Sequence, residues 1–171
     1  MKKSNIRPFP VYFDRYINLV PEEDIHDAYK SSLTYLTKMD TSALRDIGDK
    51  VYAPGKWTIK DILQHIIDSE RIFAYRALRF ARKDSTRLHS FEENDYATAA
   101  QANARSLDLI LSELEATRVS TMLMFESFDD ETLMRKGVSS DKEISVLGLG
   151  FTIIGHQIHH FNVISERYMG L

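Results

Sequence analysis

The sequence predicts an all-α protein folded as a four-helix bundle. Four long segments carry apolar residues at helical spacing, and none shows the strict alternation of a half-buried strand. Amphipathic helices of this length bury their apolar stripes by packing against one another. The chain has 171 residues, 43% of them hydrophobic and 27% charged, which is typical of a globular protein and ample for one core. We therefore expect a single domain over residues 1–171.

The first two helices are predicted over Pro21 to Met39 and over Thr58 to Arg82. The first opens with Pro-Glu-Glu-Asp, which places a proline and acidic residues in the first turn, where the helix dipole favours them. In the second, Thr58 and Asp61 have the spacing of a capping box, in which two side chains satisfy free backbone N–H groups.

The third helix is predicted over Ala99 to Phe128 and the fourth from Ser145 to Tyr168. The polar segment Asp84–Tyr96 is expected to be a loop without a helix, at the rim of a pocket. The connections span about fourteen to seventeen residues, more than a simple bundle needs. A loop of about fourteen residues reaches about 46 Å, whereas a helix of about 25 residues is about 37 Å long. The second and third helices can therefore be parallel, although loop length does not require it.

Two histidines four residues apart, His156 and His160, are the most informative feature of the chain. On a helix this spacing projects both rings from one face, which here is the apolar face. Such a pair of neutral imidazoles suits a divalent transition metal, and His65 in the second helix is the candidate third ligand. The alternative is that each histidine is a core-edge residue satisfied by a hydrogen bond. That alternative is favoured for His65 alone but not for the pair, because two unpaired buried imidazoles are costly.

Five further polar residues lie on the same two helices and are candidates for the pocket or for the surroundings of the ligands: Asp61, Asp68, Ser69, His159 and Arg167. Each also has a simpler interpretation as a structural or solvated residue. Gln157 stands where a HExxH protease carries its glutamate, so that class is excluded. His26 and His89 are expected at the surface.

Composition argues against several classes of partner. The net charge of −3 gives no general attraction to nucleic acid or to an anionic membrane. The longest apolar run, 146–155, is too short to span a bilayer, and no signal peptide is visible. The chain has no cysteine, which fits the cytoplasm and excludes thiolate ligands. A basic stripe of Arg76, Arg79 and Lys83 ends the second helix, where it complements the dipole or, alternatively, meets an anionic substrate.

The segments Lys56–Arg71 and Gly155–Asn162 resemble the DinB/YfiT-like superfamily, and the resemblance spans nearly the whole chain. It implies a four-helix bundle in up-down-down-up order, which agrees with the crossover that the loop length permits. It also implies a divalent metal, zinc or nickel, held at the positions of His65, His156 and His160. Relatives of this kind include bacillithiol S-transferases and mycothiol-dependent maleylpyruvate isomerases. A homodimer is a further expectation from the resemblance.

These observations favour a metal-dependent enzyme that acts on a small-molecule substrate. A metal with an open position lowers the pKa of a bound thiol, so a low-molecular-weight thiol is a candidate co-substrate for transfer to, or isomerisation of, an electrophile. The same position activates water for hydrolysis, and the residues do not separate these reactions. The alternative from another class is a non-catalytic metal-binding bundle that serves in stress response or as an interaction module.

Overall fold

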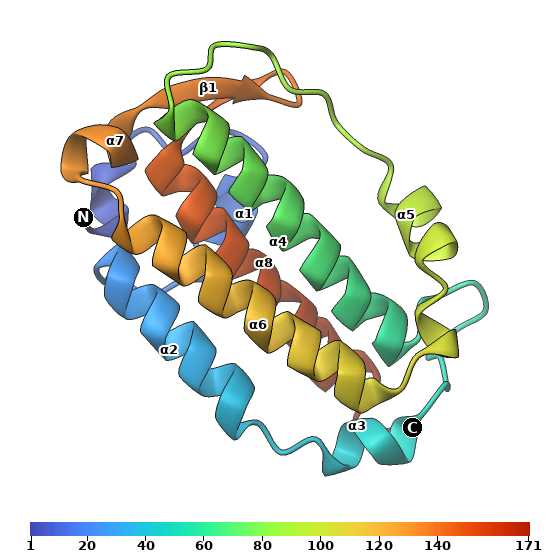
Figure 1. Ribbon diagram of the computed structural model, residues 1–171. Coiled ribbons are helices and arrows are strands. Elements are labelled where there is room, and N and C mark those ends of the chain that lie inside the picture. Colours follow the sequence, from blue (N-terminus) through green and yellow to red (C-terminus); the bar gives the residue numbers. More distant parts are fainter.

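The computed structural model describes residues 1–171 and is dominated by four long helices. They are α2 (Ile25–Lys38), α4 (Ile59–Ala81), α6 (Leu107–Glu126) and α8 (Val146–Arg167). Helices α2 and α8 run in one direction and α4 and α6 in the other (Figure 1), which confirms the up-down-down-up order. Both α4 and α2 contact α6 and α8, so the four helices close into a square. None of the helices combines the length and apolarity needed to cross a membrane.

Shorter elements pack around the four long helices. They are η1 (Lys3–Asn5), α1 (Asp14–Ile17), α3 (Ser42–Ile47) and α7 (Asp130–Met134). Among these, α1 packs along α8.

Side-chain caps define where the long helices begin. The capping box of α4 is present: Thr58 accepts from the backbone of Asp61, and the carboxylate of Asp61 accepts from the backbone of Thr58. In α8 the hydroxyl of Ser145 accepts from a backbone N–H of the first turn. Helix α2 begins later than predicted, because Asp24 is its N-cap and accepts from the backbone N–H of His26. The preceding Pro-Glu-Glu therefore lies outside the helix.

The structure differs from the prediction between α4 and α6. A helix, α5 (Glu93–Ala100), occupies part of the predicted loop and ends at Gln101, whose backbone is left-handed (φ 48°). A 3₁₀ helix, η2 (Ala102–Ala104), follows, and α6 starts only after its N-cap Ser106. The prediction of one continuous helix from Ala99 is therefore wrong. Alanine favours a helix locally, but the left-handed residue reverses the chain.

A small antiparallel hairpin was absent from the prediction. It consists of β1 (Lys136–Ser139) and β2 (Lys142–Ser145), with Lys136 opposite Ser145. Residues 140–141 make the turn, and both have positive φ. Strands of four residues are too short for their alternation to be distinguished from a loop.

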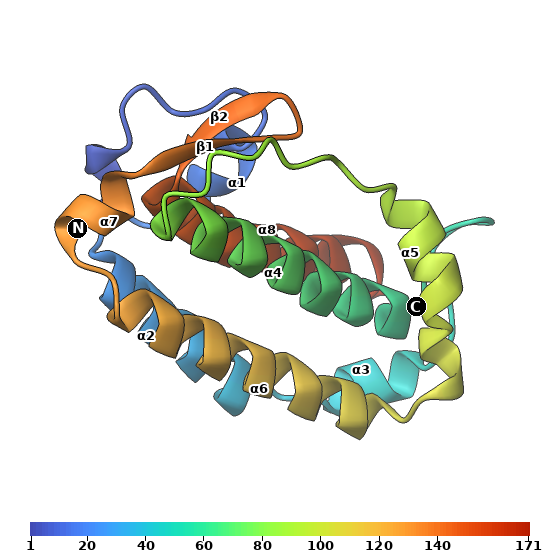
Figure 2. The same ribbon diagram turned by 45° about the horizontal axis from the view of Figure 1, so that its top comes forward.

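The connection from α4 to α6, residues 82–106, returns along the length of the bundle. This return is required because α4 and α6 are parallel, so the end of one lies far from the start of the other (Figure 2). It places α5 against α4. The crossover that the loop length permits is therefore realised.

A layer of polar side chains divides the apolar core into two clusters. One cluster includes Phe73 and Ile154, and the other includes Ile67 and Phe161. On each long helix, buried polar residues stand between the members of the two clusters. This polar layer consists of Ser32, Ser69, Glu70, Arg118, Thr121, His156 and Gln157. It crosses the bundle at the level of the histidine pair.

Arg118 is the centre of the polar layer. Its side chain is fully buried, and its Nε and Nη2 donate to the carboxylate of Glu70 at 2.8–3.2 Å. Its Nη1 donates to the hydroxyl of Ser32, which in turn donates to Oε1 of Gln157 at 2.9 Å. These bonds link all four long helices and satisfy a charge pair that is shielded from water.

Gly155 on α8 allows α1 to approach closely. A Cβ atom at this position would overlap the backbone carbonyl of Tyr16, which cannot rotate away as a side chain can. We expect Gly155→Ala to lower the free energy of unfolding by about 1–3 kcal/mol, as overpacking does. In an exposed helix the replacement of glycine by alanine would instead raise the stability by about 1 kcal/mol. Urea unfolding followed by circular dichroism measures the difference.

The matched control is Gly170→Ala, since that glycine has open space around it. It should change the stability by less than about 0.5 kcal/mol. A Gly155→Ala protein as stable as the wild type would contradict the close packing of α1 on α8.

Candidate metal centre

Three histidines converge beside the polar layer. His65 comes from α4, whereas His156 and His160 stand one turn apart on α8. The Nε2 atom of His156 lies 3.1 Å from Nε2 of His65 and also 3.1 Å from Nε2 of His160. Each ring contributes one potential ligand atom to a group whose members all lie within 4.8 Å of one another. The structure thus brings together the three residues predicted as ligands.

The two close contacts of His156 Nε2 cannot both be well-aligned hydrogen bonds. A ring nitrogen of a neutral imidazole either carries one hydrogen and donates, or carries one lone pair and accepts. The second contact therefore leaves a lone pair or an N–H group without an aligned partner. A cation between the three nitrogens removes this conflict, because all three lone pairs then face one positive charge.

Burial keeps the three imidazoles neutral. His65 and His156 are buried and His160 is half-buried. Desolvation, with a smaller electrostatic effect of neighbouring imidazoles, lowers the pKa of His65 to about 4 and that of His160 to about 3. The same causes, desolvation foremost, hold the pKa of His156 well below its usual range. At neutral pH their lone pairs are therefore available to a metal.

Aromatic rings hold the imidazoles in place. The ring of Trp57 lies 4.8 Å from His65, and the ring of Tyr16 lies 5.1 Å from His156, edge to face. Tyr16 comes from α1, and burial raises the pKa of its hydroxyl to about 12, so it stays protonated. The rings are thus oriented by packing, which resists rotation of each imidazole.

The donor set fits a divalent transition metal. Three neutral imidazoles with no fourth protein ligand are typical of catalytic zinc, and imidazole also suits nickel. Two imidazole nitrogens on one tetrahedral zinc stand roughly 3.3 Å apart for Zn–N lengths of about 2.0–2.1 Å. The 3.1 Å separations in the cluster are close to this value.

A cavity of about 220 Å³ reaches His65 and His156. Helix α4 also contributes Ser69, Phe73 and Arg76 to its wall. All other lining residues come from the N-terminal segment, the connection 82–106 and the β1–β2 hairpin. They are Tyr12, Phe13, Tyr16, Ser90, Phe91, Glu93, Ser140 and Lys142. The long helices thus carry the histidines, and the connections supply most of the wall.

Of the five further polar candidates, the structure places only Ser69 on this cavity. Asp61 belongs to the α4 cap and accepts from Asn103, and Asp68 accepts from Gln64 at 3.0 Å beside a different surface hollow. His159 is exposed, with its ring 5.6 Å from that of Tyr16.

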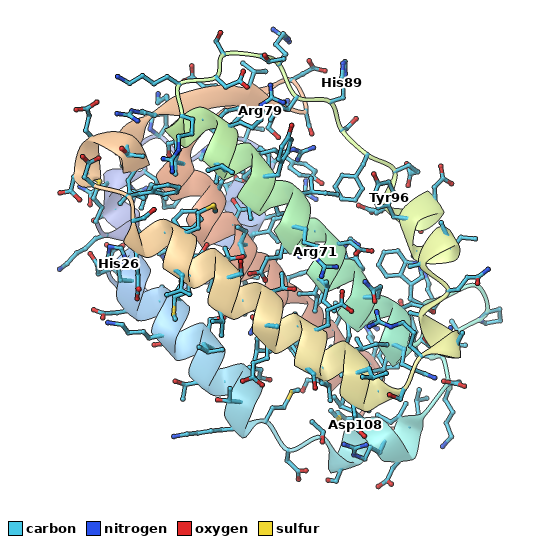
Figure 3. The ribbon with its side chains drawn as sticks, in the orientation of Figure 1. His26, Arg71, Arg79, His89, Tyr96 and Asp108 are labelled. Atoms are coloured by element: carbon cyan, nitrogen blue, oxygen red, sulfur yellow. The ribbon has the colours of Figure 1, made fainter.

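Arg167 is also exposed and makes no ion pair. The two remaining histidines, His26 on α2 and His89 on the connection 82–106, do not belong to the three-histidine group; Figure 3 shows where both lie.

The predicted pocket residues omit three charged residues of the cavity: Arg76, Glu93 and Lys142. The sequence offered a signal only for Arg76, which lies on the same helix as His65 and near buried aromatic residues. The basic stripe predicts a solvated Arg76 that complements the helix dipole, whereas the structure buries it to 4% exposure. Glu93 and Lys142 lie on α5 and on the hairpin, two elements that the sequence did not predict.

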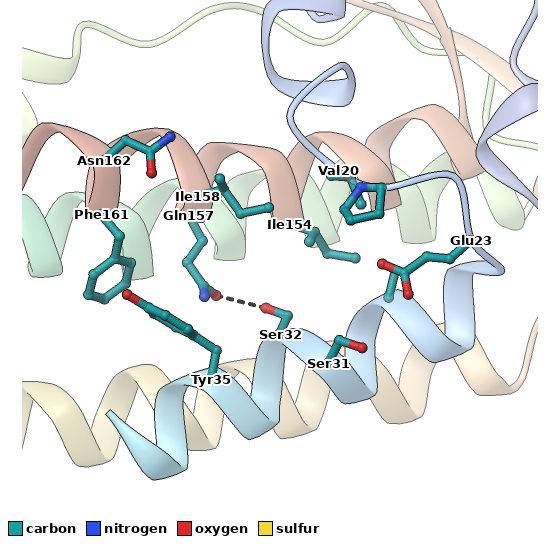
Figure 4. Close-up of a pocket in the computed structure, with 12 residues that line it drawn as sticks. Val20, Glu23, Ser31, Ser32, Tyr35, Ile154, Gln157, Ile158, Phe161 and Asn162 are labelled. Carbon is teal, nitrogen blue, oxygen red and sulfur yellow. Dashed lines mark hydrogen bonds between the residues drawn. The ribbon is translucent and has the colours of Figure 1, made fainter. Parts of the chain in front are cut away.

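A larger cavity, about 320 Å³, lies on the other side of α8 (Figure 4). It is bounded by α2 and α8, and the hydrogen bond between Ser32 and Gln157 forms its floor. Its walls hold apolar residues such as Ile154 and Phe161 and contain no histidine. We therefore take the smaller cavity, which touches the three-histidine cluster, as the candidate reaction site.

The metal-free protein should lose stability as the pH falls from 7 to 5. The pKa values of His65 and His160 in the folded protein lie below the ordinary value of 6.5. Between these values the unfolded chain binds protons at both histidines, whereas the folded chain does not. This stability is present above about pH 6.5 and decreases as the pH falls toward the folded pKa values. At pH 5 the loss is about 2 kcal/mol for each such histidine. Urea unfolding in the presence of a chelator measures it.

A His65→Gln protein should lose less stability between pH 7 and 5, because its unfolded chain has one histidine fewer that binds a proton. An unchanged stability between pH 7 and 5 in the wild type would contradict the burial of neutral imidazoles.

Comparisons with known proteins identify the family and the fold. A family model described as the DinB superfamily matches residues 13–164. A protein of Oceanobacillus iheyensis, provisionally named as a metal-dependent hydrolase, is 26% identical over 151 residues, covering 82% of this chain and 86% of its own. The solved structure of YfiT from Bacillus subtilis, described as a probable metal-dependent hydrolase with an unusual four-helix bundle topology, matches with a TM-score of 0.66. That match has 16% identity and covers 90% of this chain and 84% of YfiT, and it supports the fold.

Proposed function

The chain belongs to the DinB superfamily, and we propose that it is a metal-dependent hydrolase acting on a small molecule. His65, His156 and His160 would hold the cation, for which zinc and nickel are the candidates. The names given to two similar proteins support the reaction class. The size of the cavity supports a small substrate.

The observation that carries the proposal is the double contact of His156 Nε2. Two other imidazole nitrogens lie 3.1 Å from it, and a shared cation satisfies all three at once. A core built only for stability would have little use for three neutral imidazoles turned toward one point, because their desolvated lone pairs cost free energy.

The residues around the cluster suggest a division of roles. A divalent cation held by three imidazoles supplies Lewis acidity and lowers the pKa of a water or thiol in its open position. Glu93 is the only carboxylate on the cavity wall, so we assign to its oxygen the role of accepting a proton during hydrolysis. Tyr16 and Phe73 form aromatic walls that exclude bulk water from one side of His156.

The test begins with metal content. Protein purified without added metal is examined by elemental analysis, and the metal-free form is titrated with Ni²⁺ and Zn²⁺. Trp57 is the single tryptophan and packs against His65, so its fluorescence reports occupancy of the site. If neither Ni²⁺ nor Zn²⁺ changed the fluorescence or the stability of the protein, the proposal would be overturned.

Activity is then measured on a panel of esters, amides and lactones, with and without low-molecular-weight thiols. Hydrolysis is expected without thiol, and it should be lost in His160→Ala and in Glu93→Gln, of which only the second keeps the metal. His26→Ala is the matched control, because it removes a histidine that does not belong to the three-histidine group. Turnover only in the presence of a thiol would assign the protein to the transferases instead.

A further inference from the structure

Arg76 is a buried cation on the wall of the reaction cavity. It lies on α4 and is 4% exposed, and its guanidinium sits 5.6 Å from the centre of the Phe73 ring. The other side of the cavity holds His156, whose ring centre is 6.0 Å from that of Phe73. Arg76 and His156 therefore both lie within 6.0 Å of the centre of the same aromatic ring.

The charge of Arg76 has no partner in the protein. It takes part in none of the ion pairs of the chain, and its only hydrogen bond runs from Nη2 to the backbone carbonyl of His89 at 2.6 Å. Burial lowers the pKa of its guanidinium, which reflects the cost of desolvating the charge. Its other N–H groups make no hydrogen bond within the protein, and its side chain lines the cavity. A buried arginine without a counter-charge is costly unless something else supplies that charge.

The other arginines of the bundle show that this arrangement is unusual within the fold. Arg118, the second buried arginine, is neutralised by Glu70 at 2.8 Å. Arg79, one turn after Arg76 on the same helix, pairs with Asp84 at 2.5 Å. Of the two buried arginines, only Arg118 is thus given a carboxylate by the chain. Arg76 lacks one, although Glu93 lines the same cavity without pairing with it.

We infer that Arg76 binds an anionic group of the substrate, a carboxylate or a phosphate ester, while the bond to be cleaved lies at the three histidines. This inference rests on the proposed function. A guanidinium binds both groups through two parallel N–H donors, and Lys142 adds a second positive charge to the same wall. The substrate is therefore a small acid that reaches from Arg76 to the three histidines past the ring of Phe73.

Hydroxamates test the inference because they bind metals without being hydrolysed. Acetohydroxamate is compared with ω-carboxyl hydroxamates of two, three and four methylenes and with the matching phosphonates, by calorimetric titration of the nickel-loaded protein. We expect the best carboxylated or phosphonylated compound to bind at least about tenfold more tightly than acetohydroxamate, as a desolvated charge pair allows. The preferred acid distinguishes a carboxylate from a phosphate substrate.

Two variants separate recognition from a structural role. Arg76→Gln keeps an N–H donor for the carbonyl of His89 but removes the charge. It should reduce the preference for the acidic hydroxamate over acetohydroxamate to less than about threefold, while the binding of acetohydroxamate itself stays unchanged. Arg76→Lys should restore part of the preference. Arg82→Gln, an exposed arginine near the end of the same helix, should leave the preference at its wild-type value.

The outcomes are distinct. Equal binding of acidic and neutral hydroxamates to the wild type, or a preference that survives in Arg76→Gln, would overturn the inference and leave the proposed function standing. A nickel-loaded protein that binds no hydroxamate would overturn the proposed function as well. If Arg76→Gln bound acidic and neutral hydroxamates equally poorly, the arginine would serve only to hold the connection 82–106 through the carbonyl of His89, and the inference would fail.

Discussion

Replacing His156 by alanine should weaken the binding of Ni²⁺ or Zn²⁺ by on the order of a thousandfold. His156 is the central member of the cluster, because its Nε2 lies 3.1 Å from those of both His65 and His160. Without His156 only two imidazoles remain, and these two no longer have the neighbour that contacts both of them. Titration in the presence of a competing chelator, followed by Trp57 fluorescence, gives the metal dissociation constants of the wild type and of His156→Ala.

His159→Ala is the matched control for this prediction. His159 is a neighbour on the same helix, but it is exposed and lies outside the three-histidine group. Its removal should change the metal affinity by less than about threefold, since effects beyond the direct ligands are smaller. A His156→Ala protein with wild-type affinity would show that the metal binds elsewhere.

Replacing Arg118 by leucine should lower the free energy of unfolding by about 3–5 kcal/mol. The change leaves Glu70 buried and charged without its partner, and it removes the donor that fixes Ser32. Breaking one side of a buried ion pair costs more than the pair contributes, because the remaining carboxylate has lost its solvation in folding. Urea unfolding followed by circular dichroism measures the loss.

Two further proteins test the reason for that loss. The double variant Glu70→Gln with Arg118→Leu should recover part of the stability, because no uncompensated charge remains. Arg45→Leu breaks an exposed pair with Asp108 and should cost less than about 1 kcal/mol. Equal losses for Arg118→Leu and Arg45→Leu would contradict the importance of burial.

The long helices were predictable because their signals are local. Apolar spacing and the Thr58 capping box identify α4, and the i, i+4 spacing of His156 and His160 identifies both a helix and a site on it. The structure places His65 beside that pair, and the order of the helices is as expected. The connections were less predictable. Gln101 ends α5 through a left-handed backbone, which no residue-type preference indicates strongly for glutamine.

The charges in the interior were also missed, although the sequence contained a signal for them. Arg118 follows Leu114 by four residues and precedes Thr121 by three, so it lies on the apolar stripe of α6. Glu70 has the same relation to Ile66 and Phe73 on α4. Each residue alone looks like an interruption of its stripe. Only the packing of α4 against α6 shows that the two interruptions neutralise each other.

The cavity wall has a consequence for how such proteins diversify. The three histidines are fixed on α4 and α8, but most of the wall, including Tyr12, Ser90 and Lys142, belongs to segments outside the bundle. Insertions or exchanges in those segments would alter the shape and charge offered to a substrate without moving the imidazoles. One bundle can thus host new specificities through changes that leave the three histidines in place.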